Sequence, residues 1–319
     1  MEPALRPLST SQVLDRTFHV YRSHFILLAG IGILLPSLLL VLRLAFVPLG
    51  YPPRGMVVRN PFVFWTVFLE YAFSWILLYV IGHAITGAAT VYAVARLQLG
   101  ESATIVECYR KTLPRFWRVL RIALNIYARV VGAGIVTYLA CVLVVVGAVA
   151  ASEWVGASGK DVVLWLAIVV GVCVGLGGIF WMLYLYARYC LAIPACVIED
   201  LPVRPALRRS RFLTRESIRQ ITLIYLLMAV LGLGLSTILW LPGQFSALYF
   251  RHAFLMAVVL RSMGSFIAGA LAGPIATIAI ALVYYDQRIR KEAFDLQVLM
   301  DSMPPTESAP VSPAAPDTA

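Results

Sequence analysis

The chain has 319 residues, of which 61% are hydrophobic and 13% are charged, and its mean hydropathy is +0.85. Soluble domains average about 45–50% apolar and about 25% charged residues, so this composition excludes a water-soluble globular protein and predicts a multi-pass membrane protein. Five cysteines, an odd number scattered through apolar runs, also argue against a secreted domain held together by disulfides.

Six apolar stretches are long enough to cross a bilayer as helices. A helix needs roughly 20 mostly apolar residues to cross about 30 Å of hydrocarbon. The sequence lacks the short alternating strands that are typical of outer-membrane barrels. We therefore predict an all-α polytopic membrane bundle. Its expected transmembrane helices are 25–47, 62–94, 118–149, 162–187, 219–241 and 253–285.

A short amphipathic helix is predicted directly before the first, third and fifth spans. Each of these segments places apolar residues on one side and mostly basic residues on the other at helical spacing, which is typical of a helix at the membrane interface. Pro114 should kink the second segment, because proline removes a helical hydrogen bond. The segments are 13–25, 105–120 and 206–221.

The unit of one amphipathic helix and two spans recurs about every 95–100 residues. We interpret it as an internal triplication with a common orientation, although basic amphipathic inner loops are common in any multi-pass protein. The expected integral membrane domain is 1–300, and its repeats are about 9–95, 101–190 and 202–286. Residues 301–319 contain five prolines and no aromatic residue, which predicts a disordered cytosolic tail.

The net charge of +10 is distributed unevenly along this topology. With the N-terminus in the cytosol, 19 of the 26 Lys and Arg residues fall on inner segments and six on outer segments, as the positive-inside rule requires. We predict a bacterial plasma (inner) membrane protein with both termini cytoplasmic and no cleavable signal peptide. No soluble module with interleaved aromatic residues accompanies the basic charge, so we do not expect nucleic-acid binding.

The basic sides of the inner segments predict contact with anionic lipid headgroups. In the third segment, arginines at steps of 4, 3, 4 and 4 residues stack along one side of a helix. Arginine suits phosphate because its planar fork donates two hydrogen bonds at once. The predicted headgroup-binding residues are Arg204, Arg208, Arg211, Arg215, Arg219, Arg110, Lys111 and Arg118.

Ionisable residues inside spans are rare and often functional. Arg129 and His83 each lie deep within a span, at similar depth. We predict an interior polar patch of Arg129, His83, Thr86 and Asn125, which is either functional or a structural cluster of hydrogen bonds. Gly273–Pro274 should break the last span and could mark a hinge or a cavity, although glycines within spans more often serve close helix packing.

The sequence contains no P-loop, GxSxG, HExxH or CxxC motif. His19 and His24 are five residues apart, which is a poor spacing for a metal site, so we expect no metal, no cofactor and no enzymatic activity. The acidic residues Glu199, Asp200 and Asp286 are expected to neutralise nearby arginines or to cap helices rather than to act as catalysts.

Three motifs resemble the bacterial glycerophosphoryl diester phosphodiesterase membrane-domain-like family. They are RPLSTSQVLDRTFHVYRSHF (6–25), PACVIEDLPVRPALRRSRFLTRES (194–217) and YYDQRIRKEAFDL (284–296). Glu216 departs from the family pattern, which usually has glycine after Leu-Thr-Arg. The resemblance implies an integral membrane domain. The phosphodiesterase of that family is a separate soluble barrel with its own metal-binding motifs, and none of these motifs is present in this chain.

The sequence favours a non-catalytic membrane protein whose cationic inner helices engage anionic lipid headgroups or a membrane-protein partner. One alternative is a transporter or flippase of a lipid or a lipid-linked molecule, for which repeated spans and interior polar groups are typical. A lipid-headgroup hydrolase is a weaker alternative, because it requires clustered acids, bases and metal ligands.

Overall fold

The computed structural model describes residues 9–50, 61–155, 157–215, 217–249 and 254–292. These residues form helices and turns without any strand. Six of the described helical segments are long and apolar enough to cross a membrane. The prediction of an all-α polytopic bundle is therefore confirmed, and the protein is a multi-pass membrane protein. The predicted tail, 301–319, lies outside the described residues.

The first third of the chain contains an amphipathic helix, a broken apolar helix and a long apolar helix. Ser9 caps the amphipathic helix with a capping box, as its sequence suggests. The apolar helix breaks at Ile33, three residues before Pro36, because proline has no N–H to donate to the carbonyl of Gly32. The elements are α1 (Thr10–Ser23), α2 (Phe25–Gly32), α3 (Leu34–Gly50) and α4 (Pro61–Gln98).

The middle third begins with a second amphipathic helix, and the kink predicted at Pro114 is confirmed. A 3₁₀ turn at Leu113–Arg115 separates the short helix from the next span. The predicted amphipathic helix 105–120 is therefore too long, since its residues from Phe116 onward belong to the span. The elements are α5 (Ile105–Thr112), η1 (Leu113–Arg115), α6 (Phe116–Trp154) and α7 (Ala157–Tyr189).

The last third starts with two short helices, of which the sequence analysis predicted only the second. Helix α8 is too short to cross a membrane, and its residues 192–197 are all buried. The third amphipathic helix ends at Thr214, so the predicted helix 206–221 is also too long. Pro274 lies inside an unbroken last helix, which corrects the predicted break at Gly273–Pro274. The elements are α8 (Ala192–Ile198), α9 (Val203–Thr214), α10 (Ile218–Tyr249) and α11 (Phe254–Glu292).

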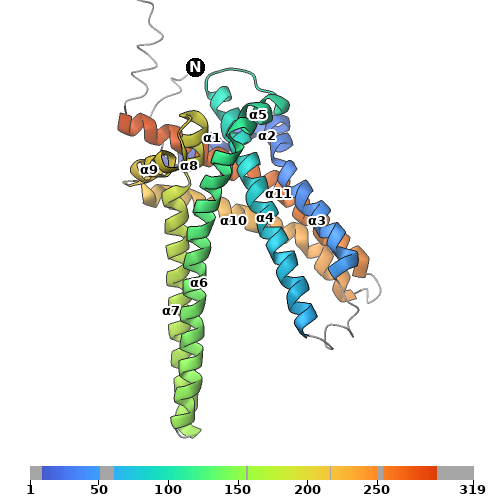
Figure 1. Cartoon of the computed structure of the whole chain (residues 1–319), viewed down its shortest axis with the longest axis vertical. Coiled ribbons are helices and arrows are strands. Elements are labelled where there is room, and N and C mark those ends of the chain that lie inside the picture. Colours follow the sequence, from blue (N-terminus) through green and yellow to red (C-terminus); the bar gives the residue numbers. More distant parts are fainter. Residues whose placement is uncertain (1–8, 51–60, 156, 216, 250–253, 293–319) are drawn as a thin grey trace, which may run out of the picture.

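The short helices α1, α5, α8 and α9 gather at one end of the molecule, which we call the packed end (Figure 1). The hairpin of α6 and α7 contacts α4 and α10 near this end and then extends away from the group of α3, α4, α10 and α11 (Figure 1). In the most apolar stretch of each span, only 6% of the residues are buried in α6 and in α7, against 56% in α4 and 50% in α11. Helices α4 and α11 are therefore central, whereas the hairpin leaves most of its apolar surface exposed.

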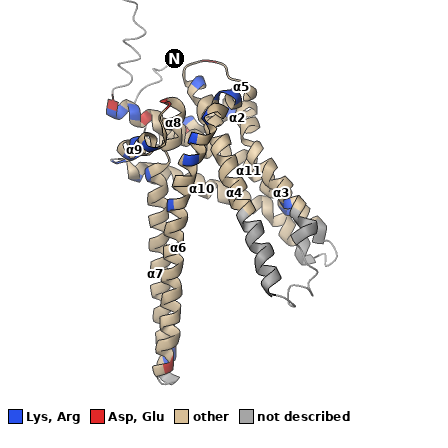
Figure 2. Ribbon diagram, in the orientation of Figure 1, with Lys and Arg blue, Asp and Glu red and all other residues tan. Residues whose placement is uncertain are grey.

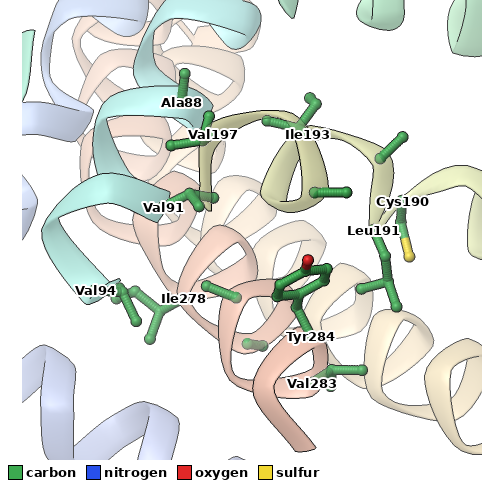
Figure 3. Close-up of a cluster of buried hydrophobic side chains, with 14 of the residues drawn as sticks. Ala88, Val91, Val94, Cys190, Leu191, Ile193, Val197, Ile278, Val283 and Tyr284 are labelled. Atoms are coloured by element: carbon green, nitrogen blue, oxygen red, sulfur yellow. The ribbon is translucent and has the colours of Figure 1, made fainter. Parts of the chain in front are cut away.

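The main core lies at the packed end, where α8 packs against α4 and α11 (Figure 3). Val91 and Val94 of α4, Leu191 before α8 and Ile278 of α11 are almost fully buried there. The amphipathic helices contribute their apolar sides to the same core: α1 buries Val13, Thr17 and Val20, and α9 buries Ala206, Leu207 and Leu213. These apolar sides thus pack against protein rather than being left for lipid.

The order of elements is the same three times along the chain. An amphipathic helix, α1, α5 or α9, precedes two long apolar segments in each predicted repeat. Helix α8 is an addition at the end of the second unit. The origin of this order by triplication stays a prediction.

Candidate functional site

Five arginines form an exposed surface at the packed end. Arg204, Arg208 and Arg211 lie on the exposed side of α9, Arg215 follows the end of this helix, and Arg219 lies in the first turn of α10. We call these five residues the arginine face. The predicted stripe is thus divided between two helices, because α9 ends at Thr214. Within the described residues, none of the five forms an ion pair.

The opposite side of α9 packs against the rest of the protein, and this packing orients Arg204, Arg208 and Arg211 outward. Leu213 is fully buried, and Ser210 and Thr214 donate hydrogen bonds from their hydroxyls to the carbonyl of Arg188 at the end of α7, at 3.0 and 3.3 Å. Ser and Thr side chains at these positions satisfy a carbonyl that α7 leaves free at its C-terminus. Helix α9 therefore cannot rotate its arginines inward without breaking these bonds.

Arg209 is the exception on α9, because it points into a cluster around Glu199. Its guanidinium lies 3.1 Å from the Glu199 carboxylate and also pairs with Glu292. Arg288 lies 3.4 Å from the same Glu199 carboxylate, to which the hydroxyl of Tyr284 also donates a hydrogen bond. In Figure 3 this hydroxyl points toward α8. We call these five residues the Glu199 cluster.

Charge holds the Glu199 cluster together at the edge of the core, in which Tyr284 is fully buried. Burial alone would lower the pKa of Arg209, but the hydrogen bonds and negative charges of Glu292 and Glu199 outweigh it, so the pKa is raised. The side chains of Arg209 and Glu199 are 22% and 17% exposed, so water screens their attraction only partly. The cluster therefore fixes α9 and the end of α8 to the end of α11.

Asp200 ties the same loop to the start of α6. Its backbone has a φ of +52°, a left-handed conformation that Asp adopts more readily than most residues. Its carboxylate lies 2.8 Å from the Arg115 guanidinium and 3.0 Å from that of Arg118. Arg118, one of the predicted headgroup-binding residues, is thus engaged in an ion pair, whereas Arg110 and Lys111 are exposed at the end of α5.

The prediction that the acidic residues neutralise arginines is confirmed. Glu199 and Asp200 each contact two arginines, and Asp286, which is only 2% exposed, lies 2.9 Å from Arg290. These are the carboxylates that the sequence offered for a hydrolase. All of them already have cationic partners.

The four residues of the predicted interior patch do not lie together. Asn125 is exposed on α6, and Arg129 lies over the ring of Tyr189 of α7, 4.7 Å from its centroid. His83 instead contacts Tyr127 on the side of α6 that faces α4. Each residue advances about 100° around a helix, so Asn125 and Arg129, two residues on either side of Tyr127, point away from His83. Depth alone, which the prediction used, does not decide the side of a helix.

His83 belongs to an aromatic cluster that the sequence analysis missed. Its ring stacks on Tyr79, with centroids 5.9 Å apart, and meets Tyr127 edge-on at 6.0 Å. Tyr186 of α7 and Tyr225 of α10 form a second pair at 4.4 Å. Tyrosines in four different spans were the available signal, but their meeting depends on how the helices pack.

A partly open cavity of about 380 Å³ lies between α3, α4 and α11. His83 and Thr86 line it, together with Arg43, and Pro274 closes against Gly32 at its wall. The sequence analysis considered a cavity beside Gly273–Pro274, and the structure has one there. Its lining residues do not include Arg129 or Asn125.

Comparisons with protein-family models, with curated proteins and with solved structures find no match. Membership in the family that the three motifs resemble therefore stays a prediction. The structure does bring residues of these motifs together: Glu199 from the second motif contacts Tyr284 and Arg288 from the third, and Arg209 pairs with Glu292. Helix α1, which contains much of the first motif, packs against α11.

Proposed function

We propose that the protein is a non-catalytic integral membrane protein whose arginine face binds anionic lipid headgroups. The observation that carries this proposal is the contrast between five exposed arginines without an ion pair among the described residues and three neighbours, Arg209, Arg115 and Arg118, that have carboxylate partners. Exposed guanidiniums beside the ends of the spans attract anions, and lipid phosphate is the anion available there.

The arginine face should attract anionic lipids strongly. A Lys or Arg near an anionic leaflet contributes about 1 kcal/mol of membrane attraction. Lys and Arg residues gather at the packed end (Figure 2). By the positive-inside rule this end faces the cytosol, which supports a bacterial plasma membrane protein with cytoplasmic termini. Exposed Arg110 and Lys111 extend the basic surface.

The resemblance to the glycerophosphoryl diester phosphodiesterase membrane-domain-like family supports a role in the membrane without the phosphodiesterase reaction. The ion pairs of Glu199, Asp200 and Asp286 also favour a non-catalytic role, because these carboxylates are already neutralised by arginines. A membrane-protein partner with an acidic surface is the competing occupant of the arginine face.

The test is lipid binding by the full-length protein. Purified protein is titrated in a neutral detergent with phosphatidylglycerol or phosphatidylcholine of the same chains, and bound lipids are counted by native mass spectrometry. We expect the triple variant Arg204→Gln, Arg208→Gln and Arg211→Gln to bind phosphatidylglycerol at least about tenfold more weakly, since each arginine contributes about 1 kcal/mol.

The matched control neutralises three cations away from the arginine face: Arg129→Gln, Lys160→Gln and Arg261→Gln. This variant should retain the phosphatidylglycerol affinity of the natural protein. Equal binding of the two lipids by the natural protein, or equal losses in both triple variants, would refute the proposal.

A transporter or flippase of a lipid is the second candidate, and the cavity beside His83 is the observation that favours it. The test is transbilayer movement of a fluorescent phospholipid in vesicles containing the full-length protein. Movement no faster than in protein-free vesicles would remove this candidate.

A further inference from the structure

The cavity between α3, α4 and α11 is a long groove. Its lining runs from Trp75 to Thr90 on α4 and from Ser262 to Ile280 on α11. At the helical rise of 1.5 Å per residue, these stretches are roughly 22 and 27 Å long. One leaflet occupies about half of the roughly 30 Å of bilayer hydrocarbon, so the groove is long enough for a lipid acyl chain.

Among the described lining residues, one cation, Arg43, lies at one end of this groove. Arg43, near the end of the first span, donates a hydrogen bond to the hydroxyl of Ser265 at 3.0 Å and lies over the ring of Trp75, 5.1 Å from its centroid. Both contacts leave its positive charge uncompensated, and the lining contains no carboxylate among the described residues. Because no carboxylate of the described residues neutralises it, this guanidinium attracts an anionic headgroup to the end of the groove.

The polar side chains farther along the groove differ in whether their hydrogen bonds are already made within the protein. Thr86 and Thr90 donate their hydroxyls to backbone carbonyls of their own helix, at 2.8 Å each. The Nδ1 atom of His83 is buried and has no hydrogen-bond partner among the described residues. His83 lies eight residues beyond Trp75, which is about 12 Å along α4. A ligand that runs along the groove from Arg43 therefore passes His83, whose Nδ1 atom forms no hydrogen bond with an acyl chain.

We propose that this groove binds one anionic lipid from the leaflet opposite the arginine face, with its headgroup on Arg43 and an acyl chain along α4 and α11 past His83. Arg43 lies ten residues beyond Ile33, so about 15 Å of helix separates it from the break near the packed end. The groove volume of about 380 Å³ lies within the roughly 300–1,000 Å³ range of small-molecule sites. This site is independent of the arginine face.

The experiment is site-specific photocrosslinking in the full-length protein. Benzoylphenylalanine replaces Phe266, which lines the groove, or Phe180, which is 68% exposed on the hairpin and reports bulk lipid. Each protein is reconstituted in vesicles of equal phosphatidylglycerol and phosphatidylcholine with a small fraction of oleate. The mass of each adduct identifies the lipid, so a phosphate headgroup and a fatty-acid carboxylate are told apart.

We expect the ratio of anionic to zwitterionic adducts at position 266 to exceed that at position 180 by about fivefold, the effect of one arginine near an anionic headgroup. Arg43→Gln should lower the ratio at 266 to the bulk value. Arg261→Gln, which alters another arginine that lies over a tryptophan, should leave it unchanged. Equal ratios at the two positions, or enrichment that survives Arg43→Gln, would overturn the proposal.

A groove-filling variant provides an independent test. A Cβ added at Gly273, which lines the groove, meets no atom within 4 Å, so Gly273→Leu should fill the groove and reduce all adducts at 266 severalfold relative to those at 180. Gly177→Leu, at an equally open position on the hairpin, should not. Unchanged adducts in Gly273→Leu would contradict the site. The triple variant of α9 should keep the enrichment, which separates this site from the arginine face.

Discussion

The two sides of α9 show how one residue type acquires two roles on a single short helix. Arg208 and Arg209 are neighbours in sequence, yet Arg208 is exposed, and Arg209 lies between Glu199 and Glu292. One step of about 100° around the helix separates them. The exposed side supplies charge to the surface, and the inner side uses the same charge to hold three helices together.

This comparison is tested most severely by removing the charge at the centre of the Glu199 cluster. We expect Glu199→Gln to lower the free energy of unfolding by about 3 kcal/mol, because two poorly solvated guanidiniums, Arg209 and Arg288, would then share the single carboxylate of Glu292. The measurement is thermal unfolding of the purified protein. Glu101→Gln is the control, since Glu101 is 47% exposed in its pair with Arg96 and should cost about 1 kcal/mol or less.

The neighbouring arginines provide the next test. Arg209→Gln should destabilise the protein by about 2 kcal/mol, less than Glu199→Gln because Arg288 still neutralises Glu199. Arg208→Gln should change stability by no more than about 0.5 kcal/mol, as is usual for an exposed side chain. Both variants are compared by thermal unfolding. Equal destabilisation by the two would mean that the sides of α9 do not differ as described.

Two neighbouring glycines on the α6–α7 hairpin allow the same comparison of a packed and an exposed side of a helix, without any change of charge. The effect on stability is expected to be the smallest there. A Cβ at Gly178 would lie 2.1 Å from the Thr137 side chain, whereas one at Gly177 meets nothing within 4 Å. Gly178→Leu should therefore push α6 and α7 apart and cost about 1 kcal/mol. Gly177→Leu should have almost no effect. Equal melting temperatures for the two variants would show that the hairpin is not closely packed at Gly178.

Much of the fold could be predicted because the membrane imposes simple requirements on a chain. The six predicted spans correspond to helices in the structure, since each apolar run must satisfy its backbone groups internally. The kink at Pro114 also follows directly from the chemistry of proline. The ends of the amphipathic helices were less predictable: nothing in the periodicity of 206–221 requires the end at Thr214, where the hydroxyl of this residue binds the end of α7.

The candidate sites were also only partly predictable from the sequence. Exposure of Arg204, Arg208 and Arg211 follows from helical spacing alone, because the apolar residues of α9 must be buried on the opposite side. The interior patch failed as a prediction because depth in a span does not specify which neighbour a side chain faces. Arg129 consequently lies over Tyr189, and His83 lies among tyrosines.

Hydropathy and helical periodicity are local properties of a chain, and they are enough to predict a polytopic helical membrane protein with a basic side on its third amphipathic helix. The burial of α8, the ion pairs of Arg209 and Arg118, and the position of Arg43 at the end of a groove become visible only when the helices are packed together. These features join residues far apart in the chain. Their contacts depend on the rotation and crossing of whole helices, which no local pattern specifies.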